Sequence, residues 1–171
     1  FMYFSVIMIA LVVASAFFIT IFGTPNLIKV AKLKRLVDDP EDPRKIHHRS
    51  VPTIGGVLIY FVILTNGFFW LALGDALNHE AFKQYSVLLA CMTVVFAMGL
   101  TDDLVGISAS KKLIVHLFAG ALLVTVGGFR IEGFGGLFGI EAMSETISTM
   151  FSLFVYIVVV NAWNLIDGID G

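Results

Sequence analysis

Amides and carboxylates crowd the last eleven residues, 161–171 (NAWNLIDGIDG), directly after a long apolar run. Asn161, Asn164 and Asp167 are spaced by three, so on a helix each side chain lies beside the next. Gly168 and Gly171 then allow the chain to leave the helix, because glycine adopts backbone angles that other residues resist. A single polar residue here would be a hydrated helix end, whereas two amides and two carboxylates at this spacing favour a binding site.

A second acidic motif, Thr101-Asp102-Asp103, also follows an apolar run. Carboxylate and amide oxygens suit Mg²⁺ or Mn²⁺, and Mg²⁺ typically joins one or two carboxylates to substrate phosphates. Adjacent residues of a helix project about 100° apart, so we expect Asp102 and Asp103 to have different roles rather than to chelate one ion together. Aspartates at the C-terminal end of a helix oppose its dipole, and a bound cation would offset that cost.

A basic segment, residues 44–49 (RKIHHR), lies just before an expected helix start at Pro52 and Thr53. Unpaired backbone N–H groups and the helix dipole attract anions at such a start. The phosphate-binding candidates are Arg44, Lys45, His47, His48, Pro52 and Thr53. The alternative is that basic residues beside a membrane reflect only topology and attraction to lipid headgroups, and we favour that interpretation for Lys29–Arg35.

The composition is that of a membrane protein, since 58% of the 171 residues are hydrophobic and only 14% are charged. A helix that crosses the hydrocarbon layer of about 30 Å needs about 20 apolar residues. Five windows approach this: 2–22, 54–73, 85–100, 113–126 and 147–162, the fourth being short unless Lys111 and Lys112 snorkel. The predicted fold class is therefore an all-α polytopic membrane protein with five transmembrane helices. The single cysteine, Cys91, excludes a disulfide framework.

The distribution of charge predicts which motifs face the cytoplasm. Most of the basic residues lie between the first two windows: Lys29, Lys32, Lys34, Arg35, Arg44, Lys45 and Arg49. Cytoplasmic loops carry such an excess, so we expect the N-terminus outside and loops 24–53 and 101–112 inside, with the end of the chain. Both acidic motifs and the basic segment then share the cytoplasmic face, which indicates phosphoryl transfer involving a lipid.

Two connecting segments have patterns of their own. Residues 28–37 mix apolar residues with lysines, as does a basic helical extension lying at the membrane interface. On the outer side, residues 129–141 (FRIEGFGGLFGIE) alternate apolar and polar types around glycines, which predicts a short β-hairpin between the fourth and fifth helices. Neither pattern indicates catalysis.

In this order, residues 44–48 (RKIHH), 52–56 (PTIGG), 99–103 (GLTDD) and 161–171 resemble the polyprenyl-phosphate N-acetylhexosamine-1-phosphate transferase family. The form of the basic segment resembles the branch that begins O-antigen, enterobacterial common antigen or teichoic acid linkage synthesis. The peptidoglycan branch, which transfers phospho-MurNAc-pentapeptide, usually carries a lysine and Gly-Thr-Pro-Thr where this chain has His48 and residues 50–53 (SVPT). That branch stays the alternative.

The resemblance implies transfer of N-acetylhexosamine-1-phosphate, most specifically GlcNAc-1-phosphate, from a UDP-sugar to undecaprenyl phosphate with release of UMP. It implies Mg²⁺, or Mn²⁺, as cofactor. The residues that it assigns are Asp102, Asp103 and Asp167 as catalytic groups, Asp102, Asp103, Asn164 and Asp167 around the metal, and Asn161, Asn164, Gly168, Ile169 and Asp170 in substrate binding, with Asp170 accepting a hydrogen bond from uracil. Whether Asp102 acts as a base is left open.

Members of that family typically have ten or eleven membrane helices, with a further essential aspartate and a His-rich loop beyond the fifth. We therefore expect residues 1–171 to be a single transmembrane domain, the N-terminal part of a longer catalytic domain, and to be inactive alone. The expected location is the bacterial inner membrane. The expected partners are the two substrates and membrane lipid, without nucleic acid, and a homodimer is left open.

Two other classes compete with this interpretation. The CDP-alcohol phosphotransferases also place an Asp-Gly motif at a membrane surface, but theirs continues into an Ala-Arg pair, where this chain has Ile169-Asp170-Gly171. A transporter would line an ion path with charges inside its helices, whereas these aspartates lie at predicted helix ends. His116 is the one ionisable residue expected inside a helix, and a packed histidine accounts for it.

Overall fold

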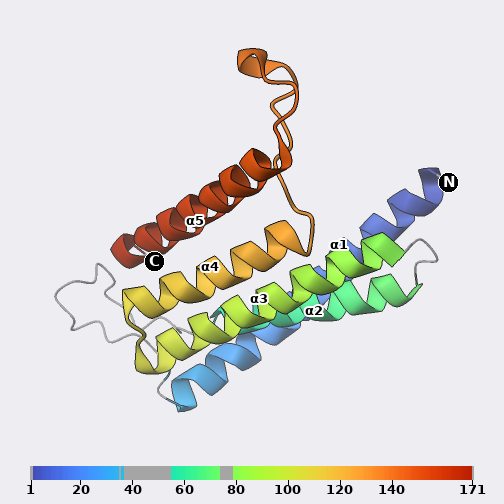
Figure 1. The fold of residues 1–171 in the computed structure, drawn as a ribbon. Coiled ribbons are helices and arrows are strands. Elements are labelled where there is room, and N and C mark those ends of the chain that lie inside the picture. Colours follow the sequence, from blue (N-terminus) through green and yellow to red (C-terminus); the bar gives the residue numbers. More distant parts are fainter. Residues whose placement is uncertain (1, 35, 37–54, 74–78, 171) are drawn as a thin grey trace. The chain divides into compact units, whose positions relative to one another are not determined.

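The structure, a computed structural model, describes residues 2–34, 36, 55–73 and 79–170, and side chains only within 6–34, 36, 55–69 and 79–166. Its elements are α1 (Met2–Leu33), α2 (Gly55–Leu73), α3 (His79–Val105), α4 (Ala109–Thr125), a 3₁₀ turn η1 (Leu137–Gly139) and α5 (Glu145–Asp170), as Figure 1 shows. The described residues contain no β-strand, so the prediction of an all-α chain holds for this part.

Over the described residues, each of the five predicted apolar windows lies in an α-helix, except that Val126 follows the end of α4. Three of these helices are long and apolar enough to cross a membrane, over residues 6–33, 79–105 and 145–166 of the described chain. α2 and α4, with 19 and 17 residues, reach only about 26–29 Å at 1.5 Å per residue. The faces of α1 and α5 expose many large apolar side chains, which fits lipid rather than water.

The first helix is longer than expected. We predicted a span ending near Phe22 and a basic helical extension over residues 28–37, and α1 runs unbroken to Leu33 with Pro25 inside it, so the two form one helix as far as Leu33. Proline removes one backbone donor from a helix. The polar side chains on either side of Pro25 bond to carbonyl groups of the same helix. The Thr24 hydroxyl donates to the Thr20 carbonyl at 2.7 Å, and the Asn26 amide donates to the Phe22 carbonyl at 3.2 Å.

The described residues divide into two compact units, and the prediction of a single domain stays a prediction. One unit contains α1, α2 and residues 102–105, and the other contains the rest of α3 with α4 and α5. In the first unit α1 and α2 pack closely at Gly23, where an added Cβ would lie 2.7 Å from a methyl group of Leu58. Small residues permit such close approach of membrane helices.

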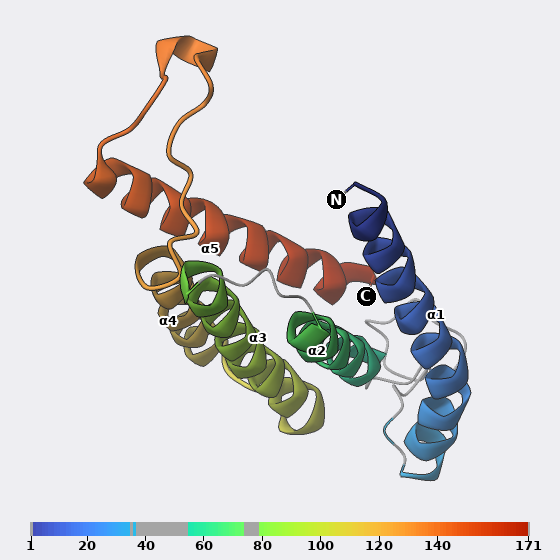
Figure 2. The ribbon, with the colours of Figure 1, turned by 90° about the vertical axis from the view of Figure 1, so that its right-hand side faces the viewer.

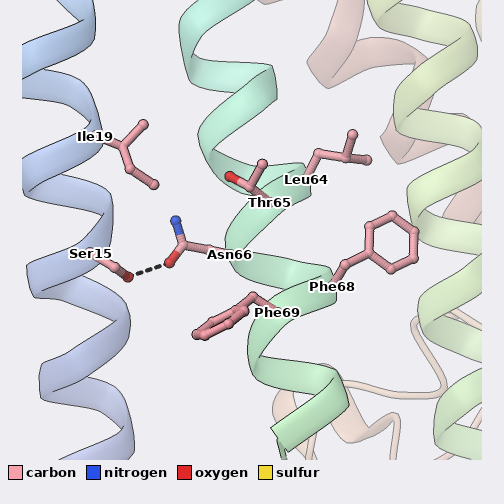
Figure 3. A pocket seen from close by; sticks show the side chains of 7 residues that line it. All are labelled: Ser15, Ile19, Leu64, Thr65, Asn66, Phe68 and Phe69. Carbon is pink, nitrogen blue, oxygen red and sulfur yellow. Dashed lines mark hydrogen bonds between the residues drawn. The ribbon is translucent and has the colours of Figure 1, made fainter.

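A polar contact also joins α1 to α2. The Ser15 hydroxyl of α1 donates to the side-chain oxygen of Asn66, a buried residue of α2 (Figure 3). The Asn66 amide in turn donates to the Val62 carbonyl at 3.0 Å. An unpaired amide inside an apolar layer would cost several kcal/mol, so this pairing favours one arrangement of the two helices.

In the second unit, α4 and α5 pack through Gly120, where an added Cβ would lie 2.5 Å from the Tyr156 ring. Its neighbour Ala119 is buried, and the Ala119 carbonyl lies 3.5 Å from the Cys91 sulfur of α3. The thiol is a weak donor, so this contact mainly reports close packing. Figure 2 shows α3 and α4 side by side, with α5 against α4.

The predicted β-hairpin between the fourth and fifth helices is not confirmed, because residues 126–144 form a narrow loop that contains η1 but no strand. Few bonds bridge its arms, among them Met143 N–H to the Glu132 carbonyl at 2.8 Å and Phe134 N–H to the Ile140 carbonyl at 3.3 Å. Positive φ angles at Gly135, Gly136, Phe138 and Gly139 interrupt the extended backbone that a ladder needs.

Candidate active site

The first acidic motif lies in the last turn of α3, as the sequence predicts. Asp102 is half-buried and Asp103 is exposed, so the two carboxylates have different surroundings, in line with different roles. The helix ends at Val105 and is followed by Gly106 with φ +74°, a common helix stop that the sequence analysis did not single out. No basic residue lies in this turn, so both carboxylates oppose the helix dipole without a cation from the same turn.

The second acidic motif continues α5. Asn161, Asn164 and Asp167 all belong to the helix, so the predicted spacing along one side of it is confirmed for the backbone. The Asn161 amide donates to the Ile157 carbonyl at 2.8 Å, and Asn164 is exposed. Gly168 does not end the helix, contrary to expectation, because α5 runs on to Asp170. The helix tolerates glycine there at a cost of about 1 kcal/mol.

Several predicted site residues fall outside what the structure describes. The structure describes only the backbone of Asp167, Gly168, Ile169 and Asp170, and Gly171 lies outside the described residues. The whole basic segment does as well, with Arg44, Lys45, His47, His48, Pro52 and Thr53. Their roles stay predictions. Of the basic residues that precede this segment, Lys29, Lys32 and Lys34 are described, and all three are exposed at the end of α1.

The donor set suits a divalent cation by its chemistry. Asp102, Asp103 and Asn164 offer carboxylate and amide oxygens, the ligands that Mg²⁺ and Mn²⁺ prefer, and each lies near the C-terminal end of its helix. Within the described side chains no three His, Cys, Asp or Glu residues cluster into a metal site. Asp167, the fourth predicted ligand, lies outside that set.

Two polar features of the described helices do not serve this site. His116 of α4 is packed, with 5% of its surface exposed and no partner for Nδ1 among the described residues, as the packed-histidine interpretation predicts. Beside the Ser15–Asn66 contact, which the sequence analysis missed, residues of α1 and α2 line an open hollow of about 620 Å³ with mainly apolar side chains (Figure 3). Its lining contains no charged group, so it offers nothing for phosphoryl transfer. In the sequence, the Ser15–Asn66 contact could have been predicted from Asn66, an asparagine in the middle of an apolar helix.

One protein-family model matches a range of the chain that contains both acidic motifs. The model of glycosyl transferase family 4 matches residues 85–171, a range that includes α3 from its second turn, α4 and α5. The basic segment lies outside this range. No solved structure matches the chain.

Named relatives match over most of the chain. The undecaprenyl-phosphate alpha-N-acetylglucosaminyl 1-phosphate transferase of Escherichia coli O157:H7 is 31% identical over 144 residues, 84% of this chain and 37% of the relative. The decaprenyl-phosphate N-acetylglucosaminephosphotransferase of Mycobacterium leprae is 29% identical over 95% of this chain and 42% of the relative. The phospho-N-acetylmuramoyl-pentapeptide-transferase of Borrelia hermsii is 27% identical over 88% and 46%.

The chain thus spans less than half the length of these relatives. The family match covers half of the chain and contains Asp102, Asp103 and the whole acidic end of α5. Relatives that resemble this chain over most of its length are transferases of sugar phosphates by name. The chain belongs to glycosyl transferase family 4.

Proposed function

We propose that the full-length protein transfers N-acetylhexosamine-1-phosphate, specifically GlcNAc-1-phosphate, from a UDP-sugar to undecaprenyl phosphate and releases UMP. The observation that carries this proposal is the pair of acidic motifs at the C-terminal ends of two membrane-type helices, α3 and α5, both inside the family match. The names of the relatives from Escherichia coli and Mycobacterium leprae supply the class of acceptor and sugar.

The reaction forms one bond and breaks one. A phosphate oxygen of the lipid attacks the sugar-bearing phosphorus of the UDP-sugar, and the bond from that phosphorus to the oxygen bridging it to UMP breaks. A phosphate monoester has its second pKa near 6, so the attacking phosphate is already mostly dianionic at neutral pH and needs no strong base. Positioning and charge neutralisation then dominate catalysis, as is general for phosphoryl transfer.

The roles of this chain's residues follow from that demand. Asp102, Asp103, Asn164 and Asp167 would hold Mg²⁺, which neutralises phosphate charge when bound. Lys45, with Arg44, His47 and His48, would bind the diphosphate beside the helix start at Pro52 and Thr53. Gly168, Ile169 and Asp170 would bind the nucleotide, with the Asp170 carboxylate accepting a hydrogen bond from uracil. Asn161 would also contact the substrate.

We propose the cytoplasmic face of a bacterial inner membrane as the place of reaction, with the N-terminus outside. The support is the excess of lysine and arginine between the first two helices. The exposed Lys29, Lys32 and Lys34 at the end of α1 suit contact with anionic headgroups there. The nucleotide-activated sugar is then available from the same side as the acidic motifs.

The donor sugar is tested with the purified full-length protein, undecaprenyl phosphate and Mg²⁺. UDP-GlcNAc, UDP-GalNAc and UDP-MurNAc-pentapeptide are offered in turn, each labelled in the sugar, and label in the lipid phase is counted. We expect transfer from UDP-GlcNAc. Exclusive use of UDP-MurNAc-pentapeptide would move the protein to the second candidate, the reaction named for the Borrelia hermsii relative, whereas transfer from none of the three would contradict the proposal.

A further inference from the structure

The loop between α4 and α5 carries an apolar tip. Residues 133–140 (GFGGLFGI), here called the loop tip, contain no charged side chain. Leu137 is 61% exposed and Phe138 is 85% exposed. The charged residues of this loop, among them Arg130, Glu132 and Glu141, lie in its two arms instead. Turn positions are mostly filled by Gly, Pro, Asn, Asp or Ser, so an exposed leucine and phenylalanine at the tip are unusual.

The backbone at the tip holds the phenylalanine ring outward at a cost. Phe138 has φ +58° and ψ +19°, a left-handed conformation that bulky residues rarely adopt. Its neighbours Gly135, Gly136 and Gly139 have positive φ angles without that penalty. A purely structural turn would be less strained with glycine at position 138, so the strained phenylalanine points to a function for its exposed ring.

The arms are fixed to α5, which gives the tip a defined direction. Ile131 N–H donates to the Ser152 hydroxyl at 2.7 Å, and the Ser148 hydroxyl donates to the Ile131 carbonyl at 2.8 Å. Arg130 forms an ion pair with Glu145 at 2.7 Å. In both views the loop leaves the ends of α4 and α5 turned aside from the axis of α5 (Figures 1 and 2). With α5 across a membrane, a loop turned aside from the axis of α5 stays near the membrane surface instead of projecting straight away from it.

The area of the apolar patch indicates which kind of partner it can bind. An aromatic side chain buries roughly 150–250 Å², so the exposed apolar side chains of the tip amount to a few hundred Å². A specific protein interface needs about 800 Å² on each partner, and the tip has no charge to complement one. Segments that anchor a protein at the membrane interface bury phenylalanine and leucine side chains at the boundary of headgroups and acyl chains.

We propose that the loop tip inserts Leu137 and Phe138 into the lipid interface at the membrane surface where α4 ends and α5 begins. The occupant is the bilayer itself, at the boundary of headgroups and acyl chains. The insertion gives the chain a lateral anchor beside its membrane-spanning helices, and it holds the arms of the loop against α5.

The test uses the full-length protein in vesicles of phosphatidylcholine and phosphatidylglycerol, in a background with Cys91→Ala and any further cysteines replaced. Phe138→Cys is labelled with an environment-sensitive fluorophore, and quenching by brominated lipid is compared with quenching by iodide in the water on both sides of the membrane. Glu141→Cys, an exposed charged position in one arm, is the matched control. Leu137→Cys repeats the test at a tip residue without a positive φ angle, should the Phe138 variant misfold.

At the tip we expect a blue-shifted emission that brominated lipid quenches several-fold more strongly than iodide does. The Glu141→Cys label should show the opposite order. Stronger quenching of both tip labels by iodide would place the tip in water and overturn the proposal. Protection of the tip labels from both quenchers would mean that protein covers the tip, and this would overturn it equally.

Discussion

At the scale of single residues, Asp102 and Asp103 show how far residue type and spacing lead. Their place at the end of a helix follows from the apolar run before them, and the structure confirms it. Their different exposure depends on what surrounds the helix, which the sequence does not show. Adjacent helical carboxylates face different directions, so their contributions to catalysis can be separated by substitution.

Removing one of these charges should abolish most of the activity and leave the protein folded. We expect Asp102→Asn, Asp103→Asn and Asp167→Asn each to lower kcat by about 10²-fold or more, the scale of losing one electrostatic group from a preorganised site. Glu141→Gln, which removes an exposed carboxylate from the loop, should retain full activity. Rates are measured as label transferred to lipid and divided by the amount of folded protein in the membrane. Loss of folded protein instead of rate would favour a structural role.

The basic segment makes a prediction of its own, based on its residue types alone. Lys45→Ala should weaken transfer about tenfold to a hundredfold, because a hydrogen bond to a charged group contributes about 1.5–3 kcal/mol. The control is Lys83→Ala, which removes an exposed lysine paired with Glu80 at 3.9 Å, a contact of little energetic weight. Comparable kinetics for the two variants, measured over a range of UDP-sugar concentrations, would remove Lys45 from the phosphate site.

At the scale of elements, all five apolar windows became helices, because a long apolar run has no better way to satisfy its backbone in lipid. Helix ends and the loop between α4 and α5 were less predictable. α1 continues through Pro25 and α5 through Gly168, since packing and environment can outweigh the local preference of one residue. The alternation in residues 129–141 indicated strands, yet the positive φ angles around Phe138 interrupt them.

The contact of α4 with α5 depends on glycine. Gly120→Ala would place a methyl carbon 2.5 Å from the Tyr156 ring, and overpacking of this kind typically costs about 1–3 kcal/mol. Gly99→Ala is the matched control, because an added Cβ there meets nothing within 4 Å and alanine favours the helix. Thermal unfolding in detergent should show a lowered Tm for Gly120→Ala alone. Equal Tm values for both variants would contradict this packing.

Ser152 is one of the residues that bind the loop between α4 and α5 to α5. Ser152→Ala removes the acceptor of the partly buried Ile131 N–H group, and a typical hydrogen bond contributes about 0.5–1.5 kcal/mol. Hydrogen exchange at Ile131 should therefore become faster. Ser86→Ala is the control, because that exposed hydroxyl only donates to the Phe82 carbonyl of its own helix. Unchanged exchange in the Ser152 variant would show that other contacts hold the arm.

At the scale of the whole molecule, the proposed reaction requires the acidic motifs to face the cytoplasm. In the full-length protein without other cysteines, Ser108→Cys should resist an impermeant thiol reagent in intact cells, and Glu141→Cys should react. Ser108 suits this purpose because its side chain makes no cap bond to α4. Both variants should react once the membrane is permeabilised. The reverse pattern in intact cells would place Asp102 and Asp103 outside and contradict the proposed orientation.

The central claim is that a sugar moves together with its phosphate. It is tested most directly with UDP-GlcNAc that carries ³²P in the sugar-bearing phosphate and tritium in the uridine, given to the full-length protein with undecaprenyl phosphate and Mg²⁺. We predict that ³²P enters the lipid phase in step with product and that tritium stays in the water as UMP. Recovery of both labels in water as UDP, with sugar alone on the lipid, would contradict the account.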